Sequence, residues 1–242
     1  MDIKLHIKRQ DNKEARAYWE DHLIRTDNEN ATIATALRLV SEKTRVSFEG
    51  DIPFRPLVWE CSCLQKKCGA CAMVVNGYPC LACDKKIIDC RGDRVIIEPL
   101  RKFPVICDLQ TDRKAMEEML IKHKVWLKGS ASDKNDDTAF EASKCIRCGL
   151  CLEICPNYYP EGDFGGMAAM TSMSRLLAKG SSEQRIESSV HYRQAVYNGC
   201  GKSLACRDVC PAGVNIEGLL VKSNVVVIWK RRMHNEKKGK NH

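Results

Sequence analysis

Fifteen cysteines in 242 residues constrain this chain more than any other feature, and most of them fall into three groups. The groups span residues 61–83, 145–155 and 200–210. The first ten residues alternate polar and apolar side chains and lack the hydrophobic region of a signal peptide, so we do not expect export. Thiols stay reduced in the cytosol, and grouped cysteines there indicate metal binding rather than disulfide bonds.

The first group contains the spacing Cys63-x4-Cys68-x2-Cys71. This is the loop spacing of plant-type 2Fe–2S ferredoxins, which need one further, distant cysteine as the fourth ligand. Two residues are available for that role, Cys80 and Cys83. A zinc site and unliganded thiols are the alternatives to a 2Fe–2S site.

A predicted hairpin decides between the two candidates. Strand-like segments at 70–75 and 78–85 flank Asn76-Gly77, a dipeptide that favours a two-residue type I′ turn. Such a turn places Ala70 opposite Cys83, level with the cysteine loop. Cys80 lies about 10 Å further along the strand and has the opposite parity. We therefore predict that the ligands of a 2Fe–2S cluster are Cys63, Cys68, Cys71 and Cys83.

Hydrophobic periodicity predicts a mixed domain around this loop. Residues 3–7 and 94–98 have strand patterns, and residues 16–26 form a weaker partner strand. Residues 32–43 have apolar side chains at helical spacing, with Asn30 or Thr32 as a candidate N-cap. Four cysteines are left over, and we interpret them as small buried hydrophobic residues, with a supporting ligand role as an alternative for Cys61: Cys61, Cys80, Cys90 and Cys107.

The second half is predicted to be helical, with no strand after Cys107. Its expected helices span 115–127, 166–179, 190–198 and 215–231, and the polar stretch 128–143 is expected to be a loop. The predicted fold class is therefore α+β. A plant-type ferredoxin-like (β-grasp) domain over residues 1–107 precedes an all-α, bacterial-ferredoxin-like two-cluster domain over residues 108–242.

An internal near-repeat carries the chemistry of this half. The two runs are Cys145-x2-Cys148-x2-Cys151-x3-Cys155-Pro156 and Cys200-x2-Ser203-x2-Cys206-x3-Cys210-Pro211. In the bacterial ferredoxin run, the fourth cysteine ligates the other cluster. That crossing rule predicts a 4Fe–4S cluster on four thiolates, Cys145, Cys148, Cys151 and Cys210. It leaves three thiolates for the second site, Cys155, Cys200 and Cys206.

Ser203 stands where the second run would have its middle cysteine. A site with three thiolates and one missing ligand fits a 3Fe–4S cluster. The alternatives are a Ser203 alkoxide that completes a 4Fe–4S cluster, and a pair of zinc sites. No acid–base pair, nucleophile or phosphate-binding loop accompanies the cysteines, so we expect no catalytic residues and no nucleotide site in this chain.

The combination resembles the iron–sulfur subunit of succinate dehydrogenase and fumarate reductase. Nearly the whole chain takes part, through Leu81-Ala82-Cys83, the segment 103–109 (FPVICDL) and both cysteine runs. The resemblance implies a flavoprotein partner with FAD that interconverts succinate and fumarate, and a membrane anchor that handles quinone. Electrons would pass from flavin through the 2Fe–2S, 4Fe–4S and 3Fe–4S clusters to quinone, or in reverse.

Two departures from the common family pattern concern the quinone site. Relatives with no haem or one haem have a tryptophan shortly after the Cys155 position and a histidine after the Cys200 position. This chain has Pro160 and Gly201 there. It looks more like the variant with a single di-haem cytochrome b anchor, in which menaquinone is handled within the anchor and electrons arrive through haem b.

Charge and rival functions complete the expectations. The formal net charge is +8, and the basic residues near the C-terminus are either a solvated tail or a contact with the anionic cytoplasmic leaflet or the anchor: Lys230, Arg231, Arg232, Lys237, Lys238 and Lys240. Aromatic residues make up only 6% and do not interleave this patch, which disfavours nucleic-acid binding. We expect a peripheral subunit on the cytoplasmic side of the membrane. The rivals are a soluble thiol-linked fumarate reductase subunit, which usually carries a further cysteine-rich domain, and a zinc-binding interaction module.

Overall fold

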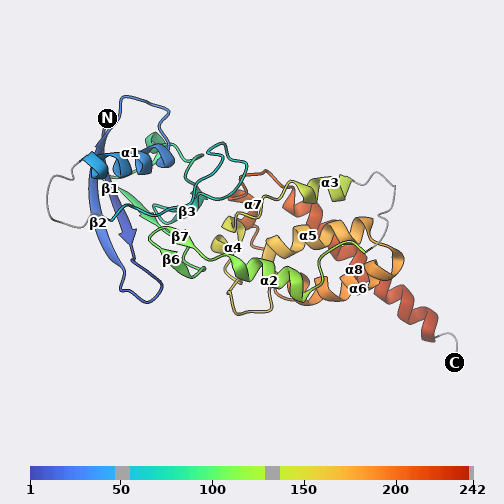
Figure 1. Cartoon of the computed structure of the whole chain (residues 1–242). Coiled ribbons are helices and arrows are strands. Elements are labelled where there is room, and N and C mark those ends of the chain that lie inside the picture. The colour runs from blue at the N-terminus through green and yellow to red at the C-terminus, as the bar shows by residue number, and fades with distance from the viewer. Residues whose placement is uncertain (47–54, 129–136, 240–242) are drawn as a thin grey trace. The chain divides into compact units, whose positions relative to one another are not determined.

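A computed structural model describes residues 1–46, 55–128 and 137–239 (Figure 1). In the helices that end at residues 46 and 239, side chains are described up to residues 42 and 228. The chain divides into two compact units. The N-terminal unit comprises Met1–Arg113 and Cys148–Glu153, and the C-terminal unit comprises Lys114–Arg147 and Ile154–His242.

The N-terminal unit is built on a five-stranded sheet with the order β2-β1-β5-β3-β4. Its strands are β1 (Asp2–Arg9), β2 (Tyr18–Arg25), β3 (Ala72–Val75), β4 (Tyr78–Leu81) and β5 (Val95–Glu98). β1 pairs antiparallel with β2 and parallel with β5, and β3 pairs antiparallel with β4 and β5. Ile3, Leu5 and Ile7 are buried, as the alternating pattern predicts. All five expected strands are confirmed.

The predicted helix is α1 (Ile33–Val46), and it contacts β2. Its apolar stripe is buried, with Ile33 and Leu37 fully excluded from solvent. The Thr32 hydroxyl accepts a hydrogen bond from the Thr35 backbone N–H at 3.3 Å. Thr32 is therefore the N-cap, one of the two candidates that the sequence offered.

The hairpin register agrees with the prediction. Val75 pairs with Tyr78 and Met73 pairs with Cys80. Asn76 and Gly77 both have positive φ, 48° and 78°, as a type I′ turn requires.

Besides the five-stranded sheet, the N-terminal unit contains the short helical turn η1 (Ile87–Asp89), which precedes β5, and a two-stranded sheet of β6 (Val105–Cys107) and β7 (Gln110–Thr111). The expectation of no strand after Cys107 is therefore wrong by one short strand. A two-residue strand is too short to show the alternation on which that prediction relied.

The described part of the C-terminal unit holds helices and no strands. They are α2 (Lys114–Lys122), α3 (Asp137–Ser143), α5 (Gly166–Lys179), α6 (Ser182–Tyr192), the π-helical turn η2 (Arg193–Tyr197), α7 (Ala205–Asp208) and α8 (Ile216–Gly239). A further helix, α4 (Leu150–Ile154), lies almost wholly in the N-terminal unit. α5 is the central helix, because it contacts α2, α3, α6 and α8 and buries most of its residues.

Three helix predictions need correction. Residues 137–143 form α3 rather than a loop, because Thr138 and Ala142 are buried and the helix packs against α5. α2 ends at Lys122 rather than at residue 127, since Lys124 adopts a left-handed φ of 51°. The helix expected at 190–198 begins earlier, as α6, where the Ser181 hydroxyl caps the Gln184 N–H at 3.2 Å. The predicted helix at 166–179 is confirmed with its boundaries.

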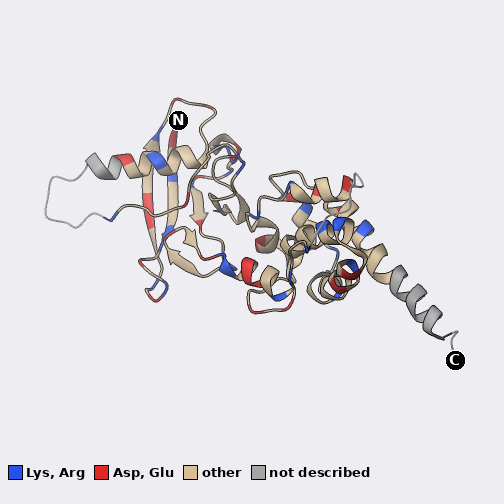
Figure 2. Ribbon diagram, turned by 45° about the vertical axis from the view of Figure 1, so that its right-hand side comes forward, with Lys and Arg blue, Asp and Glu red and all other residues tan. Residues whose placement is uncertain are grey.

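α8 includes the predicted helix at 215–231 and continues to Gly239. Neither α8 nor any other helix in the described ranges is both long enough and apolar enough to cross a membrane. The basic side chains from Lys230 onward lie outside the described residues (Figure 2). Elsewhere, lysines and arginines are distributed over both units rather than gathered on one element (Figure 2).

Candidate iron–sulfur sites

The loop from Cys63 to Cys71 turns its backbone N–H groups towards sulfur atoms. Three of its residues have positive φ, Leu64 at 51°, Lys66 at 62° and Gly69 at 76°, which curls the chain tightly. The resulting N–H···S contacts are Gln65 and Lys67 to Cys63 Sγ at 3.3 and 3.4 Å, Lys66 to Cys83 Sγ at 3.3 Å, and Ala70 to Cys68 Sγ at 3.5 Å. Donors aimed at several sulfurs are what thiolate ligands of a cluster require.

The four predicted 2Fe–2S ligands lie together. The Cys63 thiol interacts with Cys68, and the Cys71 thiol interacts with Cys83. The N–H groups of Gln65 and Lys67 lower the pKa of Cys63 to about 7, since they stabilise the thiolate. Burial raises the pKa of Cys71 to about 12. These residues therefore fit a 2Fe–2S cluster in donor type and in backbone support.

Cys80 and Cys83 have different surroundings. Cys83 accepts the N–H of Lys66, 17 residues away in the sequence, so its sulfur lies at the cysteine loop. Cys80 is opposite Met73 within the hairpin, and burial raises the pKa of its thiol to about 12. The structure thus supports the choice of Cys83 over Cys80.

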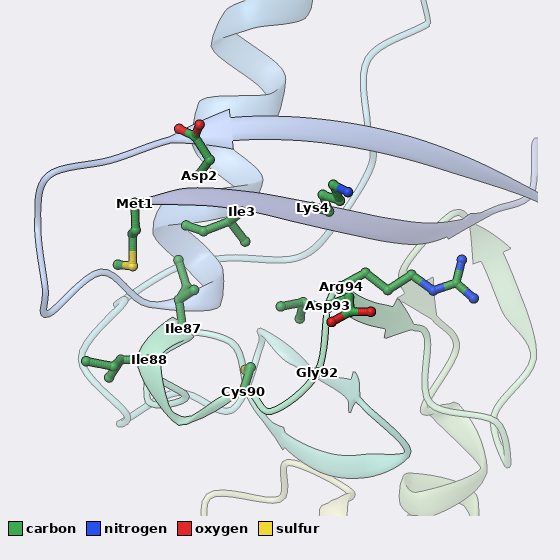
Figure 3. Close-up of a pocket in the computed structure, with 11 residues that line it drawn as sticks. Met1, Asp2, Ile3, Lys4, Ile87, Ile88, Cys90, Gly92, Asp93 and Arg94 are labelled. Carbon is green, nitrogen blue, oxygen red and sulfur yellow. The ribbon is translucent and has the colours of Figure 1, made fainter.

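The remaining cysteines of this unit differ from one another. Cys61 is exposed, so its interpretation as a buried hydrophobic residue is wrong, because it lies on the surface just before the loop. The Cys107 sulfur accepts a hydrogen bond from Arg55 Nη1 at 3.0 Å. Cys90 lines a small cavity of about 220 Å³ between the start of β1 and the segment 87–95 (Figure 3). None of the predicted ligands lines that cavity.

The first cysteine run is divided between the units. Cys148 and Cys151 belong to the N-terminal unit, and Cys145 and Cys210 belong to the C-terminal unit. Within the N-terminal unit, the buried Glu153 carboxylate accepts the backbone N–H of Lys102 at 3.0 Å, which ties α4 to the turn after β5. Cys148 is buried and follows Arg147, whose φ is 50°.

The three predicted 3Fe–4S ligands lie near one another in the C-terminal unit. Burial and the nearby thiols of Cys155 and Cys200 raise the pKa of Cys206 to about 11. Ser203 is exposed, and Leu204 with a φ of 58° turns the chain into α7. The structure therefore brings together the three cysteines that the crossing rule assigns to one site.

Gly201, next to this site, is exposed and lies beside Asn157. A Cβ atom there would lie 3.2 Å from Asn157 Nδ2, and that amide donates a hydrogen bond to the Gly199 carbonyl at 2.8 Å. Tyr158 is buried, with 3% of its surface exposed, whereas Tyr159 is exposed. The side chain of Tyr158 therefore packs within the protein.

Among the described residues, no three Cys, His, Asp or Glu side chains are arranged around a single ion position. The N–H···S contacts of the first loop fit thiolate ligands of an iron–sulfur cluster.

Comparison with known proteins defines the class. Residues 4–118 match the family of 2Fe-2S iron-sulfur cluster binding domains, and residues 141–214 match the family of 4Fe-4S dicluster domains. The chain is an iron–sulfur protein that combines a ferredoxin-like domain with a dicluster domain.

Individual relatives narrow this class. The chain is 31% identical over 226 residues to the succinate dehydrogenase iron-sulfur subunit of Bacillus subtilis, which covers 88% of this chain and 87% of the relative. It is 26% identical over 198 residues to the fumarate reductase iron-sulfur subunit of Wolinella succinogenes, covering 74% of this chain and 79% of the relative. The chain belongs to the family of succinate dehydrogenase and fumarate reductase iron–sulfur subunits.

A solved structure has the same fold. A chain of the Mycobacterium smegmatis Sdh1 complex in the apo form aligns with a TM-score of 0.73 at 19% identity, over 96% of this chain and 97% of that one. The α+β architecture predicted from the sequence is confirmed.

Proposed function

We propose that this chain is the electron-transfer subunit of a membrane-bound succinate:quinone oxidoreductase and that it has no substrate site of its own. One observation carries the proposal: four thiols converge on a loop whose N–H groups point at their sulfurs, and a double cysteine run follows it in the sequence. Each cluster, when bound, supplies a one-electron redox centre at a potential that its surroundings set.

We propose the ligand sets as follows. Residues 1–107 form the 2Fe–2S domain, with Cys63, Cys68, Cys71 and Cys83 as ligands. Residues 108–242 form the dicluster domain, with Cys145, Cys148, Cys151 and Cys210 around 4Fe–4S and Cys155, Cys200 and Cys206 around 3Fe–4S. The proximity of Cys206 to Cys155 and Cys200 supports the last set.

The proposed partners are an FAD-containing flavoprotein, where succinate or fumarate reacts, and a membrane-anchor cytochrome b. The chain would lie on the cytoplasmic side of the membrane as a peripheral subunit. Nucleic acid is not among the proposed partners, because the basic residues of the described part are spread over both units (Figure 2). A strong nucleic-acid footprint would instead gather them on one face.

We further propose that the anchor carries two haems and that menaquinone reacts there rather than against this chain. Gly201 has no side chain with which to bind a quinone carbonyl, although the residue itself is exposed. Pro160 lacks even a backbone N–H. Buried Tyr158 is a packing residue, and the exposed Asn157 amide already donates to the Gly199 carbonyl, so Tyr159 is the side-chain donor of segment 156–160 that a quinone could meet.

The test is succinate reduction of the clusters in the native complex. Purified complex treated with succinate should show the EPR signal of a reduced 2Fe–2S cluster, and the oxidised complex should show the signal of a 3Fe–4S cluster. Fumarate with a reduced quinone analogue should reverse the change. A complex that responds to a dithiol donor but not to quinol would identify the soluble thiol-linked enzyme, and one with zinc and no iron would refute the proposal.

A further inference from the structure

The side chain of Arg113 connects two separate ligand segments within the N-terminal unit. Its Nη1 donates to the Gly69 carbonyl at 3.0 Å and to the Cys148 carbonyl at 3.2 Å, and its Nη2 donates to the Ala70 carbonyl at 3.2 Å. The guanidinium also forms an ion pair with the Glu60 carboxylate. Only 20% of the Arg113 side chain is exposed.

The acceptors of these bonds belong to two proposed sites. Gly69 and Ala70 lie between the 2Fe–2S ligands Cys68 and Cys71, and Cys148 is itself a proposed 4Fe–4S ligand. The segment Cys148–Glu153 packs in the same unit as the 2Fe–2S loop. A planar guanidinium with five donors can hold several carbonyls at once, which an ammonium group does less well.

Arg113 also places a permanent positive charge beside these segments. A nearby positive charge stabilises the reduced form of a cluster, since reduction adds one negative charge, and this raises the reduction potential. Glu60 opposes that effect, and its carboxylate is held by Arg113 and by Gln110 Nε2 at 3.2 Å. The two side chains therefore form an opposed charge pair next to the proposed cluster loops.

We propose that Arg113 is a positioning residue that fixes the 2Fe–2S loop against the Cys148 segment and raises the reduction potential of the 2Fe–2S cluster, while Glu60 limits that rise. The inference rests on the ligand sets proposed above. In this proposal the ion pair of Arg113 and Glu60, neither of which is a ligand, controls the reduction potential of the 2Fe–2S cluster.

The experiment is an EPR-monitored redox titration of the native complex carrying single variants. Arg113→Gln should lower the midpoint potential of the 2Fe–2S cluster, and Glu60→Gln should raise it. Arg113→Lys keeps the charge but not the fork of donors, so its potential should lie between those of wild type and Arg113→Gln. The control is Arg101→Gln, which removes an equal charge from a half-exposed side chain paired with Glu98 beside the Gly77 turn, and it should leave the potential unchanged.

The outcomes separate this inference from a purely structural role. Loosening of the loop would shift the Arg113→Gln and Glu60→Gln potentials in the same direction, and such a result would overturn the proposal. Unchanged potentials in both variants would also overturn it. If Arg113→Gln fails to hold the cluster, Glu60→Gln decides alone, because a raised potential supports the proposal and an unchanged one refutes it. Absence of the 2Fe–2S signal in the wild-type complex would refute the proposed function instead.

Discussion

At the scale of single residues, the choice of the fourth 2Fe–2S ligand depends on strand register. Cys80 and Cys83 are three residues apart. Because side chains alternate between the two faces of a strand, an odd separation along the predicted strand places the two sulfurs in different surroundings. The pairing of Met73 with Cys80 leaves Cys83 at the loop, where it receives the Lys66 N–H. A slip of one residue would exchange the faces of the strand.

The corresponding prediction compares two alanine variants. Cys83→Ala should abolish the 2Fe–2S signal, because it removes a sulfur that lies at the loop and accepts the Lys66 N–H. Cys80→Ala should leave the spectrum close to wild type, since it removes only a half-buried thiol opposite Met73. Visible absorption and EPR of the two purified variants measure the difference, and the reverse pattern would show that Cys80 is the ligand.

A second residue-scale prediction concerns Ser203. A cysteine at this position would restore the full run of the bacterial ferredoxin pattern, so Ser203→Cys should convert the 3Fe–4S cluster towards 4Fe–4S. The EPR signal of the oxidised 3Fe–4S cluster should then weaken, with an increase in iron per chain. Ser203→Ala is the matched control and should keep the wild-type signal. A loss of the wild-type signal in that control would favour the serine as a ligand.

At the scale of elements, a buried carboxylate joins the connection between β6 and β7 to β1. Asp108 is 1% exposed and accepts hydrogen bonds from Arg9 Nε at 2.9 Å, the Gln10 N–H at 3.1 Å and the Val58 N–H at 2.9 Å. It also forms an ion pair with Arg55. Arg9 is buried as well and also forms an ion pair with Glu20, so these buried charges compensate one another as a network.

Removal of that carboxylate should destabilise the protein strongly. Asp108→Ala takes one carboxylate from the buried Arg9 and the acceptor from the Gln10 and Val58 N–H groups, and breaking such a buried network costs about 3–5 kcal/mol. Urea unfolding followed by circular dichroism measures the loss. Asp2→Ala, which breaks the exposed pair with Arg25, should leave the midpoint near that of wild type. Equal midpoints for the two variants would contradict this account.

A histidine pair near the end of α2 makes stability depend on pH. His123 Nδ1 lies 3.2 Å from His191 Nδ1 of α6, and His123 is 5% exposed. Burial lowers the pKa of His123, and His191 and Lys122 lower it further, against a smaller opposing effect of Asp163. The unfolded chain then takes up this proton more readily than the folded protein below the ordinary histidine value of about 6.5.

The contribution of His123 is therefore complete above pH 6.5 and decreases as the pH falls below that value. His123→Gln should make the melting temperature less sensitive to pH between about 7 and 5. Thermal unfolding at a series of pH values measures the slope. Lys124→Gln, which alters an exposed pair with Glu187 between the same segments, should retain the wild-type slope. An unchanged slope in His123→Gln would exclude His123 as its source.

At the scale of the whole complex, the lack of a side chain at Gly201 predicts where quinone reacts. Quantification of the purified native complex by pyridine haemochrome should give two haems for each copy of this chain. A quinone-site inhibitor should map to the anchor, away from Pro156–Pro160. A haem-free anchor, or an inhibitor bound against Tyr158 and Gly201, would contradict the proposal.

Local pattern predicted most elements correctly and failed where packing decides. The alternation in β1 and the turn residues Asn76-Gly77 are local signals, and the structure confirms both. α3 was missed because its sequence is polar, and its helix is stabilised by contact with α5. The sequence does not predict β7, because a strand of two residues is too short to show alternating polar and apolar side chains.

Cysteine spacing alone predicted the kind of cofactor and the order of the two domains, because spacing along a short run limits which thiols can reach one cluster. The Asn76-Gly77 turn also predicted the hairpin register that favours Cys83. Only the tertiary structure placed Cys148–Glu153 in the N-terminal unit and brought Arg113 to three carbonyls from two segments. The physical reason is that such contacts join residues far apart in the chain. They form because buried polar groups need hydrogen-bond partners, and this need leaves no periodic pattern in the local sequence.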